Sequence, residues 1–214
     1  MIRPPPALIA LTPGDVRERD IDSVVRLFQA CVRAGLRGVL VREPGLSDRA
    51  TLELARRLRD VVHDGWLCVH DRVHLAPASG ADAVHLGWRS LTPVAARAVV
   101  PAALRIGFSA HAGDEARLAE GADYLFFGPV KDTPSKRGIR EPTGFDALAQ
   151  FTRAVPEPVW ALGGMEPVDV ETALAASAAG VAVLGGIVRA PDPARACAAY
   201  VEAWNAHASR SAGG

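Results

Sequence analysis

Two stretches in the last third of the chain decide the fold: Val159-Trp160-Ala161-Leu162-Gly163-Gly164 and Val181-Ala182-Val183-Leu184-Gly185-Gly186. In each, a short apolar run typical of a β-strand ends in a glycine doublet. Because glycine has no side chain, its backbone N–H groups can approach a bound anion closely and point at it. In (β/α)8 barrels the phosphate-binding loops frequently follow strands seven and eight. The two stretches therefore predict the last two strands of such a barrel and a phosphate pocket at Gly163, Gly164, Gly185 and Gly186.

The rest of the chain repeats the same alternation of strand and helix. Six earlier apolar runs are predicted as strands, at 7–12, 38–42, 66–70, 83–86, 105–109 and 124–128. Helical periodicity predicts helices at 20–34, 47–64, 73–78, 93–100, 114–120, 144–154, 167–179 and 191–208. Eight such units predict one α/β domain, a (β/α)8 TIM barrel over residues 1–214, with a frayed tail at 209–214. A doubly wound open sheet is the alternative, and it needs no eighth strand.

Composition and charge narrow the class of protein. The 214 residues are 49% hydrophobic and 22% charged, and 24 Lys and Arg balance 24 Asp and Glu. This balance favours neither nucleic acid nor an anionic membrane as a partner. The apolar run at 7–11 is too short for a secretory signal or a membrane span. Three widely spaced cysteines are expected to be buried, reduced thiols in a cytoplasmic protein: Cys31, Cys68 and Cys197.

Polar residues gather where the predicted strands end, and in a barrel these ends converge on the active site. They are Arg42 at the end of the second strand, His70 and Asp71 at the end of the third, Ser90 beyond the fourth, and Ser109 and His111 at and beyond the end of the fifth. Each has an ordinary alternative, such as a structural ion pair for Arg42 or a helix cap for Asp71. The long connection 128–144 carries Lys131, Lys136, Arg137 and Arg140. It is a candidate lid, or a solvated surface loop.

An ordered set of short motifs resembles the thiamine-phosphate synthase/TenI superfamily, from about residue 7 to about residue 200. The motifs are Ala10-Leu11-Thr12, Val41-Arg42-Glu43, His70-Asp71-Arg72-Val73, Val84-His85-Leu86-Gly87, Gly107-Phe108-Ser109-Ala110-His111, Phe127-Gly128-Pro129-Val130, Thr133-Pro134-Ser135-Lys136 and Ala161-Leu162-Gly163-Gly164-Met165. As a set they are specific, although no single motif is. The resemblance implies a (β/α)8 barrel, a thiazole phosphate ligand and a possible homodimer.

The resemblance implies one of two reactions. The synthase joins a pyrimidine-methyl pyrophosphate to a thiazole phosphate, and it needs Mg²⁺ held by carboxylates as pyrophosphate leaves. The tautomerase moves a proton on a thiazole carboxylate phosphate, and it needs a general acid and base but no metal. Four matched positions depart from the synthase pattern. Leu40 stands where the synthases have a glutamine, and Pro44 where they have a lysine. His70 replaces their asparagine, and Ser90 replaces their second metal-binding aspartate.

These departures favour a tautomerase-type isomerase without a cofactor. His111 is the expected acid and base because an imidazole titrates near neutral pH, with Ser109 and His70 as further catalytic candidates. The resemblance assigns substrate and phosphate binding to Arg42, Asp71, Thr133, Ser135, Lys136 and the four glycines of the doublets. His85 is expected to position the loop before Ser90, and Trp88 to wall the pocket or cover the rim. A divergent Mg²⁺-dependent synthase, with Asp132 as a replacement carboxylate, and a non-catalytic regulator that binds thiazole phosphate are the alternatives.

Overall fold

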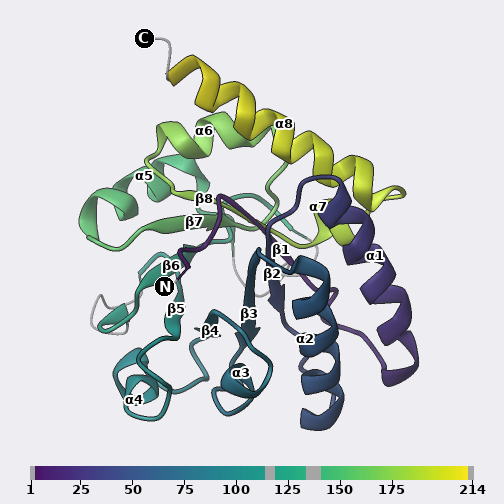
Figure 1. The fold of residues 1–214 in the computed structure, drawn as a ribbon. Helices are drawn as coiled ribbons and strands as arrows, with labels where there is room; N and C mark the ends of the chain where they lie inside the picture. Colours follow the sequence, from purple (N-terminus) through teal and green to yellow (C-terminus); the bar gives the residue numbers. More distant parts are fainter. Residues whose placement is uncertain (1–2, 114–118, 134–140, 212–214) are drawn as a thin grey trace.

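The computed structural model describes residues 3–113, 119–133 and 141–211, and all eight of its strands are parallel. Each strand pairs with the next along the chain, and β8 pairs with β1, which closes a barrel (Figure 1). The strands are β1 (Leu8–Leu11), β2 (Gly38–Val41), β3 (Trp66–His70), β4 (Ala83–Leu86), β5 (Arg105–Ala110), β6 (Tyr124–Phe127), β7 (Val159–Leu162) and β8 (Gly180–Val183). The predicted (β/α)8 barrel is confirmed, and the open sheet is excluded because the β1 to β8 pairing leaves no edge.

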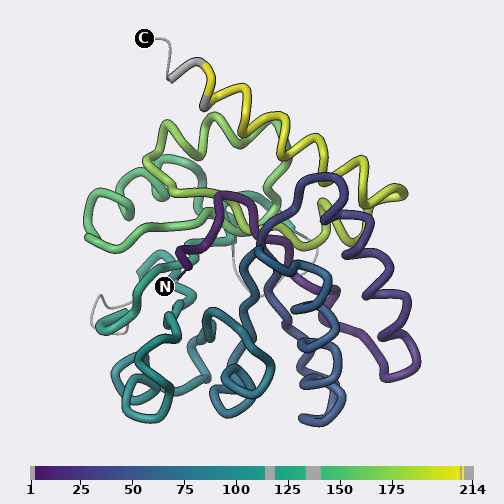
Figure 2. The backbone as a smooth tube through the Cα atoms, viewed as in Figure 1, coloured from purple at the N-terminus to yellow at the C-terminus, as the bar shows by residue number. Residues whose placement is uncertain are grey.

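Helices surround the barrel in chain order, as the run of colours around the ring in Figure 2 shows. They are α1 (Ile21–Arg33), α2 (Asp48–Val62), α3 (Leu75–Ala78), α4 (Pro93–Arg97), α5 (Gly144–Ala154), α6 (Val170–Ala175), α7 (Gly185–Val188) and α8 (Pro193–Ser211), with 3-10 turns at Glu18–Asp20 and Pro167–Asp169. The last helix, α8, packs against both α1 and α6 (Figure 1). The chain thus completes one circuit, and its last helix lies beside its first.

Several predicted helix bounds were wrong. The fourth helix ends at Arg97 rather than Val100, and the predicted helix 167–179 is a 3-10 turn followed by α6. The four residues of α7 were missed because two glycines followed by two β-branched residues show no helical period. Helix α8 continues to Ser211 rather than ending at residue 208, and 194–211 contains neither glycine nor proline; the rest of the predicted tail lies outside the described residues. Most of the predicted helix 114–120 lies outside the described residues.

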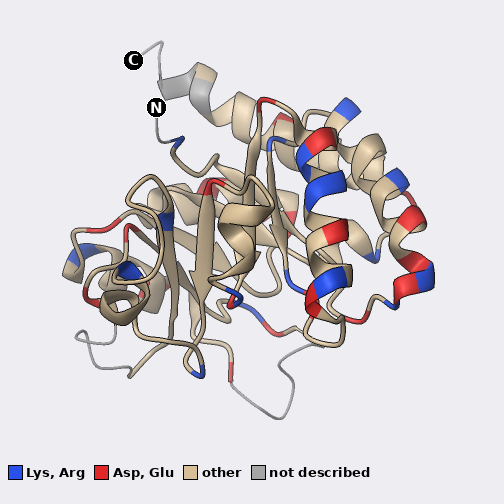
Figure 3. Cartoon of the chain, turned by 60° about the horizontal axis from the view of Figure 1, so that its bottom comes forward, with Lys and Arg blue, Asp and Glu red and all other residues tan. Residues whose placement is uncertain are grey.

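The core has two apolar layers, which follow from the alternation of side chains along each strand. One layer lies between the strands and the helices, where α1 contributes Phe28 and α2 contributes Leu54 and Leu58. The other fills the barrel interior, where the largest side chains are Trp66, Tyr124 and Trp160. Charged residues of both signs are interspersed along the helices, while the strands carry almost none (Figure 3). Within the described residues, no helix is both long enough and apolar enough to cross a membrane.

The amino ends of the strands are held by a repeated acidic clamp. Asp82, just before β4, accepts hydrogen bonds from Leu67 N at 2.9 Å and from Arg59 Nη1 at 2.7 Å. Asp123, just before β6, accepts from Ile106 N at 2.6 Å and from Arg97 at 2.5 Å. Each carboxylate thereby ties the preceding inner strand to a surrounding helix. Arg59, Arg97, Asp82 and Asp123 therefore have a structural role at this end of the barrel, which accounts for their charges without a bound ligand.

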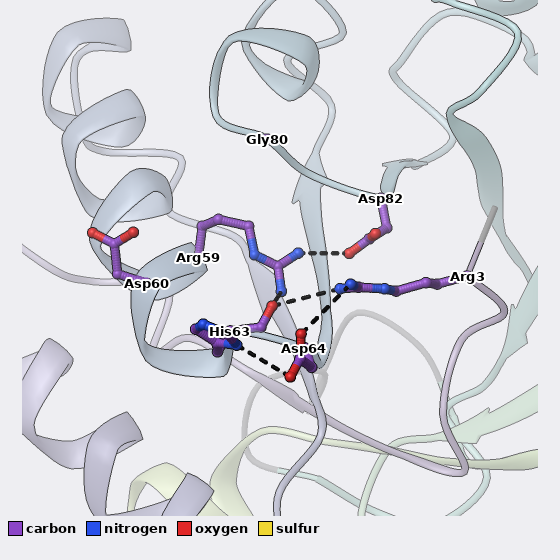
Figure 4. A pocket seen from close by; sticks show the side chains of 7 residues that line it. All are labelled: Arg3, Arg59, Asp60, His63, Asp64, Gly80 and Asp82. Carbon is purple, nitrogen blue, oxygen red and sulfur yellow. Dashed lines mark hydrogen bonds and ion pairs between the residues drawn. The ribbon is translucent and has the colours of Figure 1, made fainter. Parts of the chain in front are cut away.

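An open cavity of about 470 Å³ lies at the same end of the barrel. Figure 4 shows Arg59 reaching across it to Asp82, and Arg3 and His63 both directed at Asp64. The two guanidinium groups also donate to the Gly65 carbonyl, at 3.0 Å from Arg3 and 2.6 Å from Arg59. In TIM barrels this end serves stability, whereas the carboxyl ends carry the chemistry. The cavity is therefore not the candidate active site.

Candidate active site

The carboxyl ends of β3, β4 and β5 bring predicted site residues together. His70 and His85 are register partners on β3 and β4, and their ring centroids lie 6.2 Å apart. Ser109 on β5 places its Oγ 2.9 Å from Nε2 of His85. His111 comes two residues after Ser109 and directly follows β5, so it continues the inward alternation, and it is 9% exposed. Three imidazoles and one hydroxyl therefore come from neighbouring strands at one end of the barrel.

His85 does not position the loop before Ser90, so that expectation was wrong. Its side chain is 1% exposed and lies inside the barrel, against the Phe126 ring at 4.1 Å between centroids. Its Nδ1 faces Tyr124 Oη at 3.3 Å. Burial lowers the pKa of the His85 imidazole well below its ordinary value, and the neighbouring His70 lowers it further. His85 is consequently neutral at physiological pH and connects the site to the barrel interior.

A second part of the site is a cavity of about 160 Å³ beside β2 and β3. Its lining residues are Val41, Arg42, Glu43, Pro44, Thr51, His70, Asp71 and Arg72. The Glu43 carboxylate accepts from Gly14 N at 2.8 Å and from Val16 N at 2.9 Å, so it holds the loop after β1. Arg72 donates to Thr51 and to the carbonyl of Leu46, so it holds the loop after β2.

Arg42 and Asp71 also line this cavity, and they differ from Glu43 and Arg72 in holding no loop of the part of the chain that the structure describes. Among the described residues, neither side chain takes part in an ion pair, so the structural role considered for Arg42 is not seen. Asp71 does not cap α3 either, because His74 occupies the N-cap position of that helix. The Asp71 backbone has φ +65°, and its N–H donates to the His85 carbonyl at 2.8 Å. A guanidinium and a carboxylate at the mouth are thus available to a polar ligand.

The residues at the mouth do not supply the carboxylate pair that the family resemblance implies for Mg²⁺. Asp71 stands at the first position, but Ser90 stands at the second, where its Oγ accepts a hydrogen bond from Gly87 N at 2.8 Å. Mg²⁺ prefers oxygen ligands, and a carboxylate binds it far better than a neutral hydroxyl that is already hydrogen-bonded. Across the described ranges, no three His, Cys, Asp or Glu side chains form a group that could hold a metal ion.

Three of the four glycines in the doublets have a packing role. A Cβ on Gly163 would lie 2.7 Å from Pro129 Cα, and one on Gly164 would lie 2.5 Å from the Asp132 carbonyl oxygen. A Cβ on Gly186 would lie 2.3 Å from Tyr200 Oη on α8. Gly185 alone among the four has open space around its Cβ position. Packing alone therefore accounts for glycine at three of the four positions, and the phosphate pocket stays a prediction.

The start of the long connection after β6 is fixed to the loop after β7. Lys131 Nζ lies 2.7 Å from both Glu166 Oε2 and Asp169 Oδ2, and these hydrogen bonds raise the pKa of its ammonium. Lys131 N also donates to the Gly163 carbonyl at 3.0 Å. Lys131 is thus an anchor rather than part of a lid. Thr133 lies just beyond it, whereas Ser135, Lys136, Arg137 and Arg140 lie outside the described residues.

Three features of the site were missed from the sequence. Cys68 was expected only to be a buried thiol, and Tyr124 and Gly107 were placed in predicted strands without a role in the site. The alternation of inward positions along β3 to β6 would have placed all three beneath Ser109. Trp88 is not among the residues that line the cavity beside β2 and β3; it is 65% exposed, and Arg89 lies over its ring at 4.6 Å from the centroid.

A closed parallel barrel with ionisable side chains at its carboxyl end and glycine loops after β7 and β8 defines a (β/α)8-barrel of enzyme type. The chain belongs to the TMP-TENI family, whose model, described as "Thiamine monophosphate synthase", matches residues 11–187. The family resemblance found in the sequence is thereby confirmed, and with it a place among enzymes of thiamine biosynthesis.

Individual relatives agree with this family. A putative thiamine-phosphate synthase of Geobacter sulfurreducens is 42% identical over 82% of this chain and 83% of its own length. A thiamine-phosphate synthase of Gloeobacter violaceus is 40% identical over 85% of this chain, which spans only 54% of that relative. The solved structure of a thiamine phosphate pyrophosphorylase from Pyrococcus furiosus superposes with a TM-score of 0.80 and 28% identity, covering 92% of this chain and 94% of the other. These names favour the transferase alternative over the isomerase expected from the sequence.

Proposed function

We propose that this protein acts on a thiazole phosphate in thiamine biosynthesis and catalyses a proton shift on it, as a tautomerase-type isomerase. The observation that carries the proposal is the side-chain set at the carboxyl ends of β3, β4 and β5. His85 contacts both His70 and Ser109 there, His111 follows β5, and Asp71 stands without the second carboxylate of the implied Mg²⁺ pair. Imidazoles suit proton transfer near neutral pH, whereas pyrophosphate departure requires a well-held hard cation.

His111 is the acid and base in this proposal. It directly follows β5 at the carboxyl end of the barrel and is 9% exposed, whereas His85 is 1% exposed inside the barrel, where burial disfavours a charged ring. Arg42 is placed to bind a ligand carboxylate through its planar guanidinium, which matches two carboxylate oxygens. His70, between Arg42 and His85, is the second proton carrier or a hydrogen-bond donor at the wall. In this proposal the phosphate of the ligand is bound by Thr133, Ser135 and Lys136 and by the backbone at Gly185, where space is open.

The second candidate is the synthase reaction, which the names of the relatives support. Here Asp71 would hold Mg²⁺ together with the substrate pyrophosphate, and Asp132 would be the replacement carboxylate. Mg²⁺ sites that also use substrate phosphates often need only one or two protein carboxylates. This reaction therefore predicts strict dependence on Mg²⁺, on a pyrimidine-methyl pyrophosphate and on Asp71.

One experiment separates the two candidates. Purified protein in chelator is given the thiazole carboxylate phosphate tautomer, and proton exchange and isomerisation are followed by NMR. The proposal expects turnover that is lost in His111→Ala and retained in His63→Asn, a histidine that is exposed at the opposite end of the barrel. Turnover only with Mg²⁺ and pyrimidine pyrophosphate, with release of pyrophosphate, would establish the synthase reaction instead.

A further inference from the structure

A chain of buried polar side chains leads from Ser109 down into the barrel. His85 Nε2 lies 2.9 Å from Ser109 Oγ, and His85 Nδ1 lies 3.3 Å from Tyr124 Oη. Tyr124 Oη in turn lies 3.5 Å from Cys68 Sγ. Cys68, His85 and Tyr124 are almost completely buried and come from β3, β4 and β6. Their hydrogen bonds are therefore shielded from water and made to one another.

The hydrogen-bonded side chains of His85 and Tyr124 fit together because a glycine stands between them on β5. Gly107 on β5 is the register partner of both His85 and Tyr124. A Cβ at this glycine would lie 2.1 Å from Tyr124 Cζ and 2.5 Å from His85 Nδ1. No other residue fits between the two rings without moving them. The contact between imidazole and phenol is thus built into the barrel and is a fixed geometry.

Counting protons gives the chain a direction. The Cys68 thiol has one proton to donate. Its Sγ lies 3.7 Å from the Val69 carbonyl oxygen, in the geometry of a hydrogen-bond donor. Either atom of the contact between Cys68 Sγ and Tyr124 Oη could donate, and we assign the donor role to the Tyr124 hydroxyl, because the thiol proton is directed at the carbonyl and a phenol is the stronger donor of the two. The phenol has spent its only proton, so its oxygen can only accept from His85 Nδ1–H. Burial and the neighbouring Cys68 both raise the pKa of Tyr124, so the phenol keeps its proton.

The neutral His85 ring carries one proton, and the assigned direction of the hydrogen bonds puts that proton on Nδ1. Its Nε2 therefore has a lone pair and accepts a hydrogen bond from Ser109. We propose that Cys68 and Tyr124 are positioning residues that hold His85 in the Nδ1–H tautomer, so that Ser109 donates its proton inward and turns an oxygen lone pair towards the ligand. Ser109 then recognises a hydrogen-bond donor, such as an amino group, a hydroxyl or a protonated ring nitrogen, rather than a phosphate or carboxylate oxygen.

The tautomer of His85 rests on the geometry alone, whereas the role of Ser109 towards the ligand rests on the proposed function. The first test is therefore made without substrate. The full chain is labelled with ¹⁵N-histidine, and long-range ¹H–¹⁵N couplings report which ring nitrogen carries the proton. The His85 signals are assigned by their loss in His85→Gln. We expect the Nδ1–H form, and an Nε2–H form in the unmodified protein would overturn the proposal.

Substitution of Cys68 tests the direction of the chain. In Cys68→Ala the Tyr124 hydroxyl loses its acceptor and becomes free to donate to Nδ1, so His85 is expected to switch to the Nε2–H form. Cys68→Ser keeps an acceptor and is expected to keep the original tautomer. Cys31→Ala is the matched control, because Cys31 is an equally buried thiol on α1. An unchanged tautomer in Cys68→Ala would overturn the positioning role.

Ligand affinity then tests the role of Ser109. The KM for the thiazole phosphate is expected to rise about 2- to 10-fold in Cys68→Ala, the cost of one lost hydrogen bond, and to stay near the unmodified value in Cys68→Ser and Cys31→Ala. A switched tautomer with an unchanged KM would contradict the placing of Ser109 against the ligand, while the tautomer assignment would stand. The two failures are thus distinguishable.

Discussion

Gly107→Ala is the substitution for which the structure gives the sharpest expectation. The added methyl would lie 2.1 Å from Tyr124 Cζ and 2.5 Å from His85 Nδ1, which are both parts of rigid, buried rings. Real contacts at such distances are prevented by repulsion, so the rings or strand β5 must shift. Overpacking of this kind typically costs about 1–3 kcal/mol. Replacing a glycine elsewhere in a strand would instead gain about 0.4–1 kcal/mol from the unfolded chain.

The assay is thermal unfolding of the whole chain next to a matched control. For a protein of this size, a loss of about 2 kcal/mol lowers Tm by roughly 4–8 °C. Gly45→Ala is the control, since no atom lies within 4 Å of its Cβ position, and it is expected to leave Tm unchanged or slightly raised. The cost of Gly107→Ala should also shrink in a Tyr124→Leu background, because the two changes share one space. Equal Tm values for Gly107→Ala and Gly45→Ala would refute the reasoning.

Three further predictions concern the two ends of the barrel. Asp123→Ala removes the acceptor of Ile106 N and is expected to cost about 1–3 kcal/mol in urea unfolding with an unchanged KM, so a raised KM would contradict a purely structural clamp. Lys131→Met breaks both contacts to Glu166 and Asp169 and is expected to raise the KM for the phosphorylated ligand while Tm changes little; a KM unaffected by this change would remove the loop from the site. The unfolded chain binds a proton on His85 below pH about 6.5 whereas the folded chain does not, so stability is lost as pH falls below that value, with a slope approaching about 1.4 kcal/mol per pH unit. His85→Gln should flatten this slope, and an unchanged slope in urea titrations between pH 5 and 7 would show that the buried ring is not responsible.

The barrel was predictable because each of its units carries local signals. Short apolar runs bounded by glycine and polar residues marked the eight strands. Ser47, at the start of the predicted helix 47–64, caps α2, and its hydroxyl accepts a hydrogen bond from Ala50 N at 3.2 Å. The helix bounds were less predictable where the chain makes a turn before the helix proper, as at Pro167–Asp169. Such short elements contain too few residues to show a helical period, and their bounds are set by tertiary contacts instead.

The site was predictable as a set of positions but not as a set of contacts. His70 ends β3, Ser109 is the next-to-last residue of β5 and His111 follows β5, so the predicted strand ends place these three residues at the same end of the barrel. Which way His85 faces depends on Gly107, a neighbour more than twenty positions away whose missing side chain leaves the space. The glycine doublets illustrate the same limit, because a packing need and an anion site produce the same residue. Only the structure distinguishes Gly164, whose Cβ position is occupied by neighbouring atoms, from Gly185, whose Cβ position is open.

Isothermal titration tests the central claim most directly, namely that this mouth binds the thiazole half of the substrate pair without a metal. The protein is titrated with thiazole carboxylate phosphate in chelator, and then with pyrimidine-methyl pyrophosphate and Mg²⁺. The account predicts binding of the thiazole phosphate alone, weakened when Arg42 is replaced by methionine. Tight binding of the pyrimidine pyrophosphate that depends on Mg²⁺ and Asp71, with none of the thiazole phosphate alone, would contradict it.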